Sequence, residues 1–463
     1  MKHRVRIALI YGASLIATIG AFLLIRNLGH SLVAAGTVGP FPSSQTGPSA
    51  SGSTLMHVLI AFAVVIVLAR VLGLIFRKFN QPQVMGEVIA GILLGPSFFG
   101  WLAPWAASQI LSVSVAPYLM VMSQIGIVLY MFLVGVELDT SLLRQRTQAS
   151  IAISHASIVA PFLMGGALAL WLYPRYAARG VPFTSFALFL GVAMSVTAFP
   201  VLARILTDRG MQTSRTGVLA LSCAAVDDVT AWCLLGFVVA VAHAGARNPL
   251  LMLAMTVAFI LFVLVIVKRG ALWLVRKRAE EGRTTRDIFA IVCAALLLAA
   301  LTTEWIGIHA LFGAFLLGTL IPHDSILARD IRDKCEDAVL VLLLPMFFAF
   351  TGMRTQIGLM TETRDWLACI VIIGVASLGK FGGSFLAARL TGSDWREAAS
   401  LGILMNTRGL MELIVLNVGL DLGVLSPALF SMFVIMAILT TLATTPILQL
   451  LTPPRTAGKL QSI

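Results

Sequence analysis

Charged residues are scarce in this chain of 463 residues, of which only 12% are Asp, Glu, Lys or Arg. A soluble domain averages about 25% charged residues. By contrast, 59% of the residues are hydrophobic and the mean hydropathy is +0.95. The composition therefore excludes an ordinary soluble protein and predicts an all-α, polytopic membrane protein.

Motifs for nucleotides, metals and covalent catalysis are also missing. The sequence has no Gly-x-x-x-x-Gly-Lys-Ser/Thr loop, so we expect an ion gradient, not a nucleotide, to supply any energy. The five cysteines lack the spacing of metal ligands, and we expect free thiols packed as small hydrophobes. No set of nucleophile, base and orienting residue is visible, which argues against an enzyme, and we expect no cofactor.

Long hydrophobic runs fill most of the chain. Crossing about 30 Å of hydrocarbon takes about 20 residues of helix. Fourteen segments meet this length: 5–26, 56–76, 84–103, 117–138, 151–173, 184–206, 215–243, 250–272, 287–303, 306–322, 338–353, 366–390, 397–421 and 427–450.

The basic residues predict the orientation of these spans. If the N-terminus is inside, 23 of the 33 Lys and Arg residues lie in inside loops and 6 lie in outside loops. The positive-inside rule then places both termini in the cytoplasm, as we expect for a protein of the bacterial inner membrane. The net charge of +12 is thus an orientation signal and does not indicate nucleic-acid binding.

The apolar and polar stretches predict four regions along the chain. The expected regions are a signal-anchor or extra helix at 1–27, a disordered external linker at 28–54, a transmembrane domain at 55–450 and a short cytoplasmic tail at 451–463.

Two adjacent carboxylates, Asp227 and Asp228, lie near the middle of the apolar run 217–242. Each costs about 2.5–3.5 kcal/mol at that depth on insertion scales. Successive residues on a helix point about 100° apart, so one carboxylate can face a cavity while the other faces a neighbouring helix. The pair predicts an ion or proton site. The alternative is a buried acid that is protonated, or paired with a base, for packing alone.

Two other spans are polar at their centres. Proline cannot donate a helical hydrogen bond, and unpaired backbone is tolerated at membrane depth only beside protein or water. We therefore expect broken helices at 184–206 and 397–421, a simple kink being the alternative for each. The polar residues concerned are Ser195, Thr197 and Pro200 in the first span, and Asn406, Thr407, Arg408 and Glu412 in the second.

The positions of the two interrupted spans indicate an internal repeat. Six spans at 56–243 form repeat one, 250–272 is a connector, and six spans at 287–450 form repeat two. The interrupted span is the fifth in both sets, and the two sets begin on opposite sides of the membrane. Inverted repeats with paired broken helices are the architecture of secondary transporters, whose substrate sites lie at the midplane.

Lys380 lies near the centre of 366–390 and requires an anionic partner at that depth. Asp227 and Asp228 are both candidates; the alternative is a lysine that extends to the membrane surface. Carboxylates together with carbonyls freed by an unwound helix suit a small monovalent cation. A site that holds either a cation or a proton couples the two fluxes, whereas a cation channel or a proton-coupled transporter of a small organic solute remains an alternative.

Seven ordered motifs between about 55 and 450 resemble the cation:proton antiporter 2 family, in particular its plant-type cation/H+ exchangers and their bacterial relatives. They are Gln81–Pro96, Phe132–Glu137, Ala198–Arg204, Ala224–Trp232, His309–Phe315, Leu344–Ala349 and Met405–Leu413.

The resemblance implies a fold, a partner set and residue roles. The implied fold is an inverted-repeat antiporter with two crossing broken helices and 13 core helices, here with one added N-terminal helix. The family implies exchange of Na+ or K+ for H+ in a lipid bilayer by a homodimer. By motif, Asp228 resembles the family's essential ligand for the monovalent cation and the proton, Thr197 its unwound-helix ligand and Lys380 its core basic residue.

One position departs from the plant-type pattern. Plant-type members usually have Asn before the essential Asp, whereas this chain has Asp227, as in electrogenic sodium/proton members. We therefore expect transport that moves net charge.

Overall fold

The computed structural model describes residues 2–34, 52–111, 115–138, 148–212, 214–243, 249–273 and 286–451. Within these ranges the chain is helical and contains no β-strand. Twelve helices are long and apolar enough to cross a membrane, and one bent helix pair makes a thirteenth candidate span. The prediction of an all-α polytopic membrane protein is confirmed.

Most of the α-helices in the described residues follow the apolar runs of the sequence. In chain order they are α1 (Lys2–Gly29), α2 (Gly52–Lys78), α3 (Gln83–Leu94), α4 (Phe99–Leu102), α5 (Pro104–Ile110), α6 (Ala116–Glu137), α8 (Gln148–Tyr176), α9 (Phe183–Ser195), α10 (Phe199–Asp208), α11 (Arg215–His243), α12 (Pro249–Phe262), α14 (Arg286–Ile306), α15 (Ala310–Gly318), α16 (Ile326–Asp337), α17 (Leu344–Arg354), α18 (Thr363–Leu390), α19 (Trp395–Met405), α20 (Leu410–Asp421) and α21 (Pro427–Leu451).

One expected span differs from the structure. The segment 306–322 contains only α15, whose nine residues rise about 14 Å and do not reach across a bilayer. The reason is a sharp local turn: α14 continues to Ile306, and Gly307 and His309 then have φ of 100° and 76°. The described part of the chain therefore has thirteen candidate spans, not fourteen. Most of the expected linker and nearly all of the expected tail lie outside the described residues.

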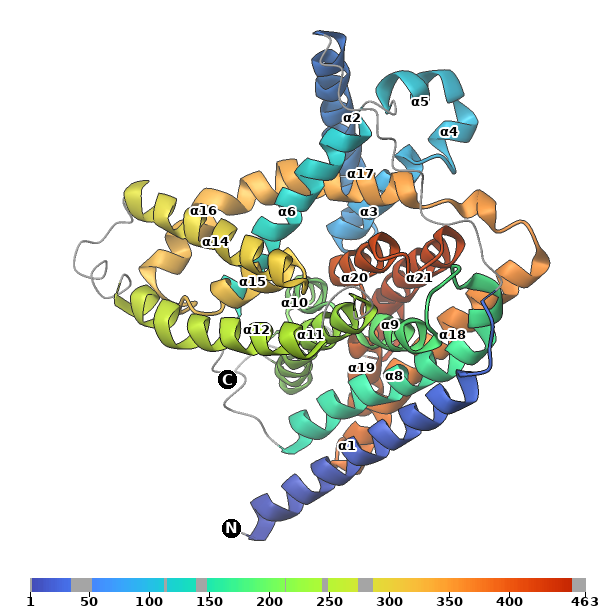
Figure 1. The fold of residues 1–463 in the computed structure, drawn as a ribbon, viewed down its shortest axis with the longest axis vertical. Coiled ribbons are helices and arrows are strands. Elements are labelled where there is room, and N and C mark those ends of the chain that lie inside the picture. The colour runs from blue at the N-terminus through green and yellow to red at the C-terminus, as the bar shows by residue number, and fades with distance from the viewer. Residues whose placement is uncertain are drawn as a thin grey trace, which may run out of the picture.

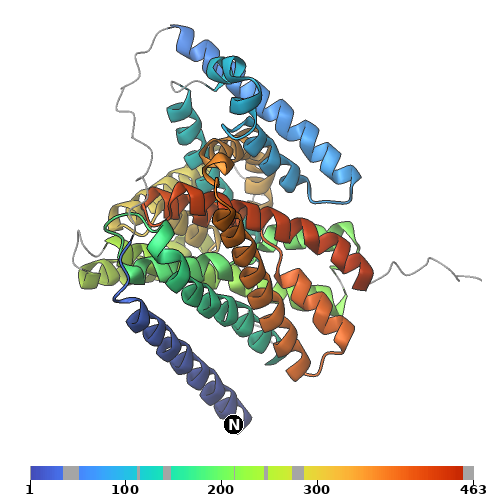
Figure 2. The same ribbon diagram turned by 90° about the vertical axis from the view of Figure 1, so that its right-hand side faces the viewer.

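The helices form two groups that Figures 1 and 2 show from two sides. In the first group, the panel, α3 packs on α2 and α17, and α6 packs on α15 and α17. In the second group, the core bundle, α8 packs on α9, α11 and α18, and α18 packs on α19 and α21. Helix α1 lies against the outside of the core bundle, on α8 and α9. The broken helices belong to the core bundle.

Close backbone contact joins α3 to α17 inside the panel. A Cβ atom on Gly91 would lie 2.0 Å from the carbonyl oxygen of Phe348, and one on Gly352 would lie 1.9 Å from the carbonyl oxygen of Gly91. Only glycine permits this approach at both positions. Small residues at such contacts are how membrane helices gain packing energy without a hydrophobic driving force.

Candidate functional site

Both interrupted spans are broken, and their breaks meet. Helix α9 ends at Ser195 and α10 begins at Phe199, while α19 and α20 are bent by 42° across the residues between Met405 and Leu410. The backbone N–H of Ala198 donates to the carbonyl oxygen of Thr407 at 3.1 Å, which joins one break to the other.

Pro200 begins a helix at the first of these breaks. It lies in the first turn of α10, where a backbone N–H would have no helical partner in any case. The proline thus fixes where α10 starts and is not merely a kink in a continuous helix. Ser195 donates to the carbonyl of Val192, one turn earlier in α9.

Arg408 caps the end of α9 from the opposite break. Its guanidinium donates to the carbonyl oxygens of Ala193 at 2.9 Å and Met194 at 2.8 Å, and to Glu412 Oε2 at 2.8 Å. Arg408 and Glu412 are both fully buried. The last carbonyls of a helix have no helical partner and carry partial negative charge, which a cation at this place offsets. Arg408 therefore satisfies these two carbonyl groups.

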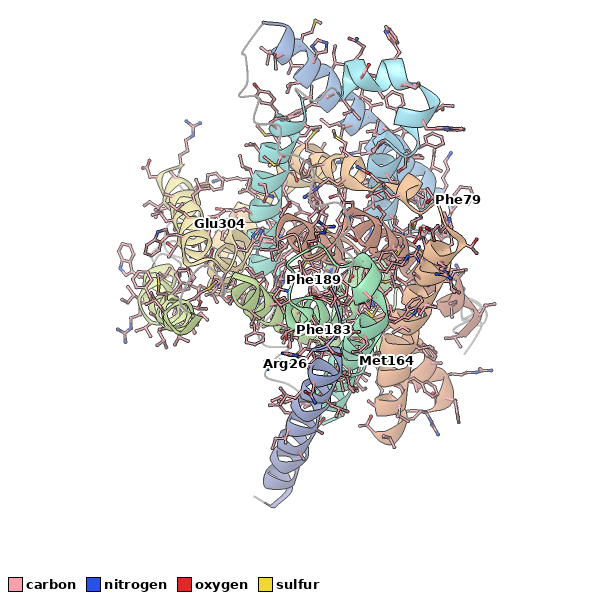
Figure 3. All side chains as sticks on the ribbon, turned by 45° about the vertical axis from the view of Figure 1, so that its right-hand side comes forward. Arg26, Phe79, Met164, Phe183, Phe189 and Glu304 are labelled. Atoms are coloured by element: carbon pink, nitrogen blue, oxygen red, sulfur yellow. The ribbon has the colours of Figure 1, made fainter. Side chains whose placement is uncertain are left out.

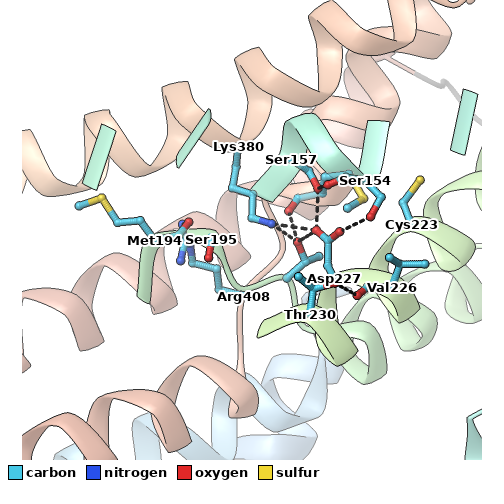
Figure 4. A network of polar contacts seen from close by, with 12 residues as sticks. Ser154, Ser157, Met194, Ser195, Cys223, Val226, Asp227, Thr230, Lys380 and Arg408 are labelled. Carbon is cyan, nitrogen blue, oxygen red and sulfur yellow. Dashed lines mark hydrogen bonds and ion pairs between the residues drawn. The ribbon is translucent and has the colours of Figure 1, made fainter. Parts of the chain in front are cut away.

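Asp227 is surrounded by hydrogen-bond donors. Lys380 Nζ lies 3.0 Å from its Oδ2 atom, Ser157 Oγ 2.7 Å and Thr197 Oγ1 3.0 Å from the same oxygen, and Ser154 Oγ 2.9 Å from Oδ1. All five side chains are at most 3% exposed, and Figure 4 shows the contacts converging from α8, α18 and the α9–α10 break. The partner of Lys380 is thus Asp227, and the alternative of a lysine reaching the membrane surface is wrong.

Thr197 links this network to the second break. Its hydroxyl accepts a hydrogen bond from Lys380 and lies 3.0 Å from Asp227 Oδ2 and 3.1 Å from the carbonyl oxygen of Met405. A hydroxyl has one proton to donate, so the carboxylate and the carbonyl compete for it. Thr197 therefore couples the ion pair to the end of α19.

Asp228 has the opposite environment from its neighbour. Its side chain is 3% exposed, and within the described part of the chain neither carboxylate oxygen has a hydrogen-bond partner. The backbone N–H of Phe199, at the start of α10, approaches it as a donor, and the side chains of Asp227 and Lys380 act on it electrostatically. A buried carboxylate without a side-chain donor is unusual among buried polar groups.

Side-chain oxygens at the second break likewise lack hydrogen-bond partners among the described residues. Asn406 Oδ1, Thr407 Oγ1 and Glu412 Oε1 are buried and, among the residues that the structure describes, have no hydrogen-bond partner. They add acceptors to the place where the two broken helices meet.

Sequence reasoning missed Ser154 and Ser157. They lie three residues apart on α8, so both face the same side of the helix. That spacing was the available signal, but a hydroxyl inside a membrane helix commonly bonds to its own backbone, as many others do in this chain. Their role as donors to Asp227 becomes visible only once α8 is placed beside α11.

Comparison with known proteins decides the family. Residues 60–451 match the family model described as sodium/hydrogen exchanger, transmembrane. The chain belongs to this family. It is 42% identical over 400 residues to the Na(+)/H(+) antiporter NhaS4 of Synechocystis, with 85% of this chain and 97% of that protein covered.

Two relatives with lower sequence identity are named as a cation/H+ antiporter and a K+/H+ antiporter. The chain is 36% identical over 417 residues to cation/H(+) antiporter 17 of Arabidopsis thaliana and 33% identical over 412 residues to K(+)/H(+) antiporter 1 of Saccharomyces cerevisiae. These matches cover 88% and 87% of this chain, which spans about half the length of each relative, 50% and 47%.

A solved structure supports the fold. The sodium proton antiporter MjNhaP1 from Methanocaldococcus jannaschii aligns with a TM-score of 0.62 at 15% identity, with 85% of this chain and 99% of that chain covered. The likeness confirms the antiporter fold that the sequence predicted.

Proposed function

We propose that the chain is a secondary active antiporter that exchanges a monovalent cation, Na+ or K+, for protons. The observation that carries the proposal is the contrast between two neighbouring carboxylates. Asp227 is held by four donors, whereas Asp228 is buried beside the meeting point of two broken helices with both oxygens free. A free buried carboxylate is suited to hold either a proton or a cation.

Competition at Asp228 couples the two fluxes. A bound cation and a bound proton each neutralise the same carboxylate, so the site cannot hold both. The site changes sides of the membrane only when one of them is bound. The broken helices supply the further oxygen ligands and allow the site to open to one side at a time. The relatives named for Na+/H+ and K+/H+ exchange support both cations as candidates.

Lys380 and Asp227 form the fixed part of the site in this proposal. Lys380 and three hydroxyl groups contact Asp227, and breaking a buried pair by removing one partner costs about 3–5 kcal/mol. Any second proton in the cycle would then move through opening of the Lys380–Asp227 pair. We further propose that the protein is a homodimer in a bacterial inner membrane, and that its C-terminus lies in the cytoplasm. The distribution of basic residues supports this orientation.

Purified protein in liposomes tests the proposal. With a pH-sensitive dye inside, pulses of Na+, K+ and Li+ are applied in turn, and at least one of these cations should drive saturable proton movement in the opposite direction. An organic cation such as choline serves as the control. Proton movement driven only by the organic cation, or cation flux with no counter-moving proton, would contradict antiport of monovalent cations.

A further inference from the structure

A large cavity lies on the outside of the core bundle, beneath the N-terminal helix. It has a volume of about 830 Å³ and is bounded by α1 on one side and by α8, α11 and the start of α9 on the other. Leu15, Ile19 and Leu23 of α1 face Ile158 and Val159 of α8 across it. Nothing in the exchange of cations for protons explains this cavity.

Several hydroxyl groups line the cavity, but their protons are already used in hydrogen bonds within the protein. Thr18, Ser222 and Thr230 each donate, at 2.8 Å, to the carbonyl oxygen four residues earlier in their own helices. Ser154 donates to Asp227. Because these donors are already used, water in the cavity would find few partners, and large apolar cavities hold apolar ligands in preference to water.

Helix α1 crosses the cavity and is attached to the core bundle on both sides of it. Near one end Ser14 Oγ lies 2.8 Å from His155 Nε2. Near the other end the rings of Phe22 and Phe162 are 5.7 Å apart, and Ile25 is buried. Much of the rest of the helix is exposed to the surroundings, and α1 therefore acts as a strap over the opening.

The cavity has the length of one bilayer leaflet. Its α1 wall runs from Leu15 to Arg26, which is about 16 Å at 1.5 Å per residue. Half of a hydrocarbon core of about 30 Å is about 15 Å. A space that is long, apolar and within the membrane-spanning part of the protein matches a hydrocarbon chain that enters from the bilayer.

One permanently charged residue, Arg26, lines the cavity and lies at its end. Figure 3 shows Arg26 where α1 reaches the start of α9, near Phe183. Arg26 is exposed, and it has no ion-pair partner in the ranges that the structure describes. A guanidinium at a membrane interface is suited to a phosphate group.

We propose that this cavity is a phospholipid site, in which one acyl chain lies between α1 and the core bundle and the phosphate of an anionic headgroup contacts Arg26. The acyl chain packs against the outer faces of α8 and α11, the helices that carry Ser154 and Asp227. The lipid thereby fills the space behind the ion pair and holds α1 to the core bundle.

Photo-crosslinking tests the site directly. The full chain is reconstituted in vesicles that contain a trace of phosphatidylglycerol with a diazirine on one acyl chain, and labelled peptides are quantified by mass spectrometry. We expect label concentrated on the cavity faces of α1, α8 and α11. Ile19→Trp and Val159→Trp fill the cavity from opposite walls and should each reduce this label several-fold. Because Ile19 is half exposed on α1, its replacement does not threaten folding of the core bundle.

Matched variants separate the site from general lipid contact. Ile370→Trp, on an exposed face of α18, should leave the label in the cavity unchanged. Phosphatidylglycerol should label the cavity roughly two- to fivefold more than diacylglycerol with the same chain, which lacks a phosphate, the ratio given by an exposed ion pair of about 0.5–1 kcal/mol. Arg26→Gln should remove this preference, and Arg364→Gln should not. Cavity label that survives both tryptophan variants, or that shows no headgroup preference in the unaltered chain, would overturn the proposal.

Discussion

At the scale of single residues, two neighbouring aspartates differ because a helix turns by about 100° between them. Asp227 points to α8, α18 and Thr197, where four donors hold it. Asp228 points elsewhere, and no side chain among the described residues donates a hydrogen bond to it. In the proposed mechanism, one carboxylate is committed to structure and the other is left for the exchangeable ion.

A second buried ion pair at the same crossing is expected to be structural. Arg408→Ala would leave Glu412 and two carbonyls of α9 without their donor, and breaking a buried pair in this way costs about 3–5 kcal/mol. We expect a clearly lower thermal unfolding temperature in detergent, with Arg408→Lys intermediate because one ammonium cannot make the same forked contacts. Arg364→Ala, an exposed substitution, is the control. An Arg408→Ala protein as stable as the unaltered chain would show that α9 does not depend on this cap.

At the scale of helices, hydropathy located most elements, because a bilayer requires long apolar helices with their backbone bonds made internally. The breaks in both polar spans were also predicted, since proline and clustered polar groups are costly in a lipid-facing helix. The short length of α15 was not predicted, because the tight turn at Gly307 and His309 interrupts an apolar run without a change in its hydropathy. Residue spacing does not identify the partner of Lys380, because that partner depends on how α11 is rotated about its axis.

Helix packing in the panel is tested by two glycine-to-alanine substitutions that should change the stability of the protein differently. Gly91→Ala places a Cβ atom 2.0 Å from the carbonyl oxygen of Phe348 and should destabilise the protein by about 1–3 kcal/mol through overpacking. Gly374→Ala in α18 meets nothing within 4 Å and should be neutral or stabilising by about 0.5–1 kcal/mol, as alanine is in a helix. Thermal unfolding of both variants in the same detergent checks the pair. Equal effects would mean that α3 and α17 do not approach as closely as described.

At the scale of the whole molecule, the panel and the core bundle meet at polar contacts as well as apolar ones. Arg354 at the end of α17 donates to Asp421 and, at 3.0 Å, to Asn417 Oδ1 on α20. Asn417 in turn donates to Thr351 of α17 at 2.9 Å. These hydrogen bonds can exchange partners more readily than interlocked apolar side chains can. If the proposed site changes sides by movement of the core bundle against the panel, the boundary that rearranges is therefore partly hydrogen-bonded.

Charge movement is a property of the complete cycle. If two protons move against one cation, either from both aspartates or with Lys380 as the second carrier, the membrane potential contributes about 2.3 kcal/mol per 100 mV per net charge. An imposed potential should then speed exchange, and Asp227→Asn should weaken that dependence. Liposomes clamped at zero or strongly negative potential, under the same pH and cation gradients, provide the measurement. Equal rates and an unchanged reversal point under both clamps would indicate electroneutral exchange.

The central claim is that Asp228 holds the exchanged cation and the proton in turn. Proton flux through Asp228→Asn protein in liposomes, recorded across a wide range of Na+ and K+ concentrations, tests it most directly. Asp227→Asn and the surface variant Asp287→Asn, reconstituted at the same density, are the comparisons. We predict no cation-dependent proton flux with Asp228→Asn at any concentration, reduced flux with Asp227→Asn and full flux with Asp287→Asn. Robust cation-dependent proton flux in well-folded Asp228→Asn protein would contradict the account.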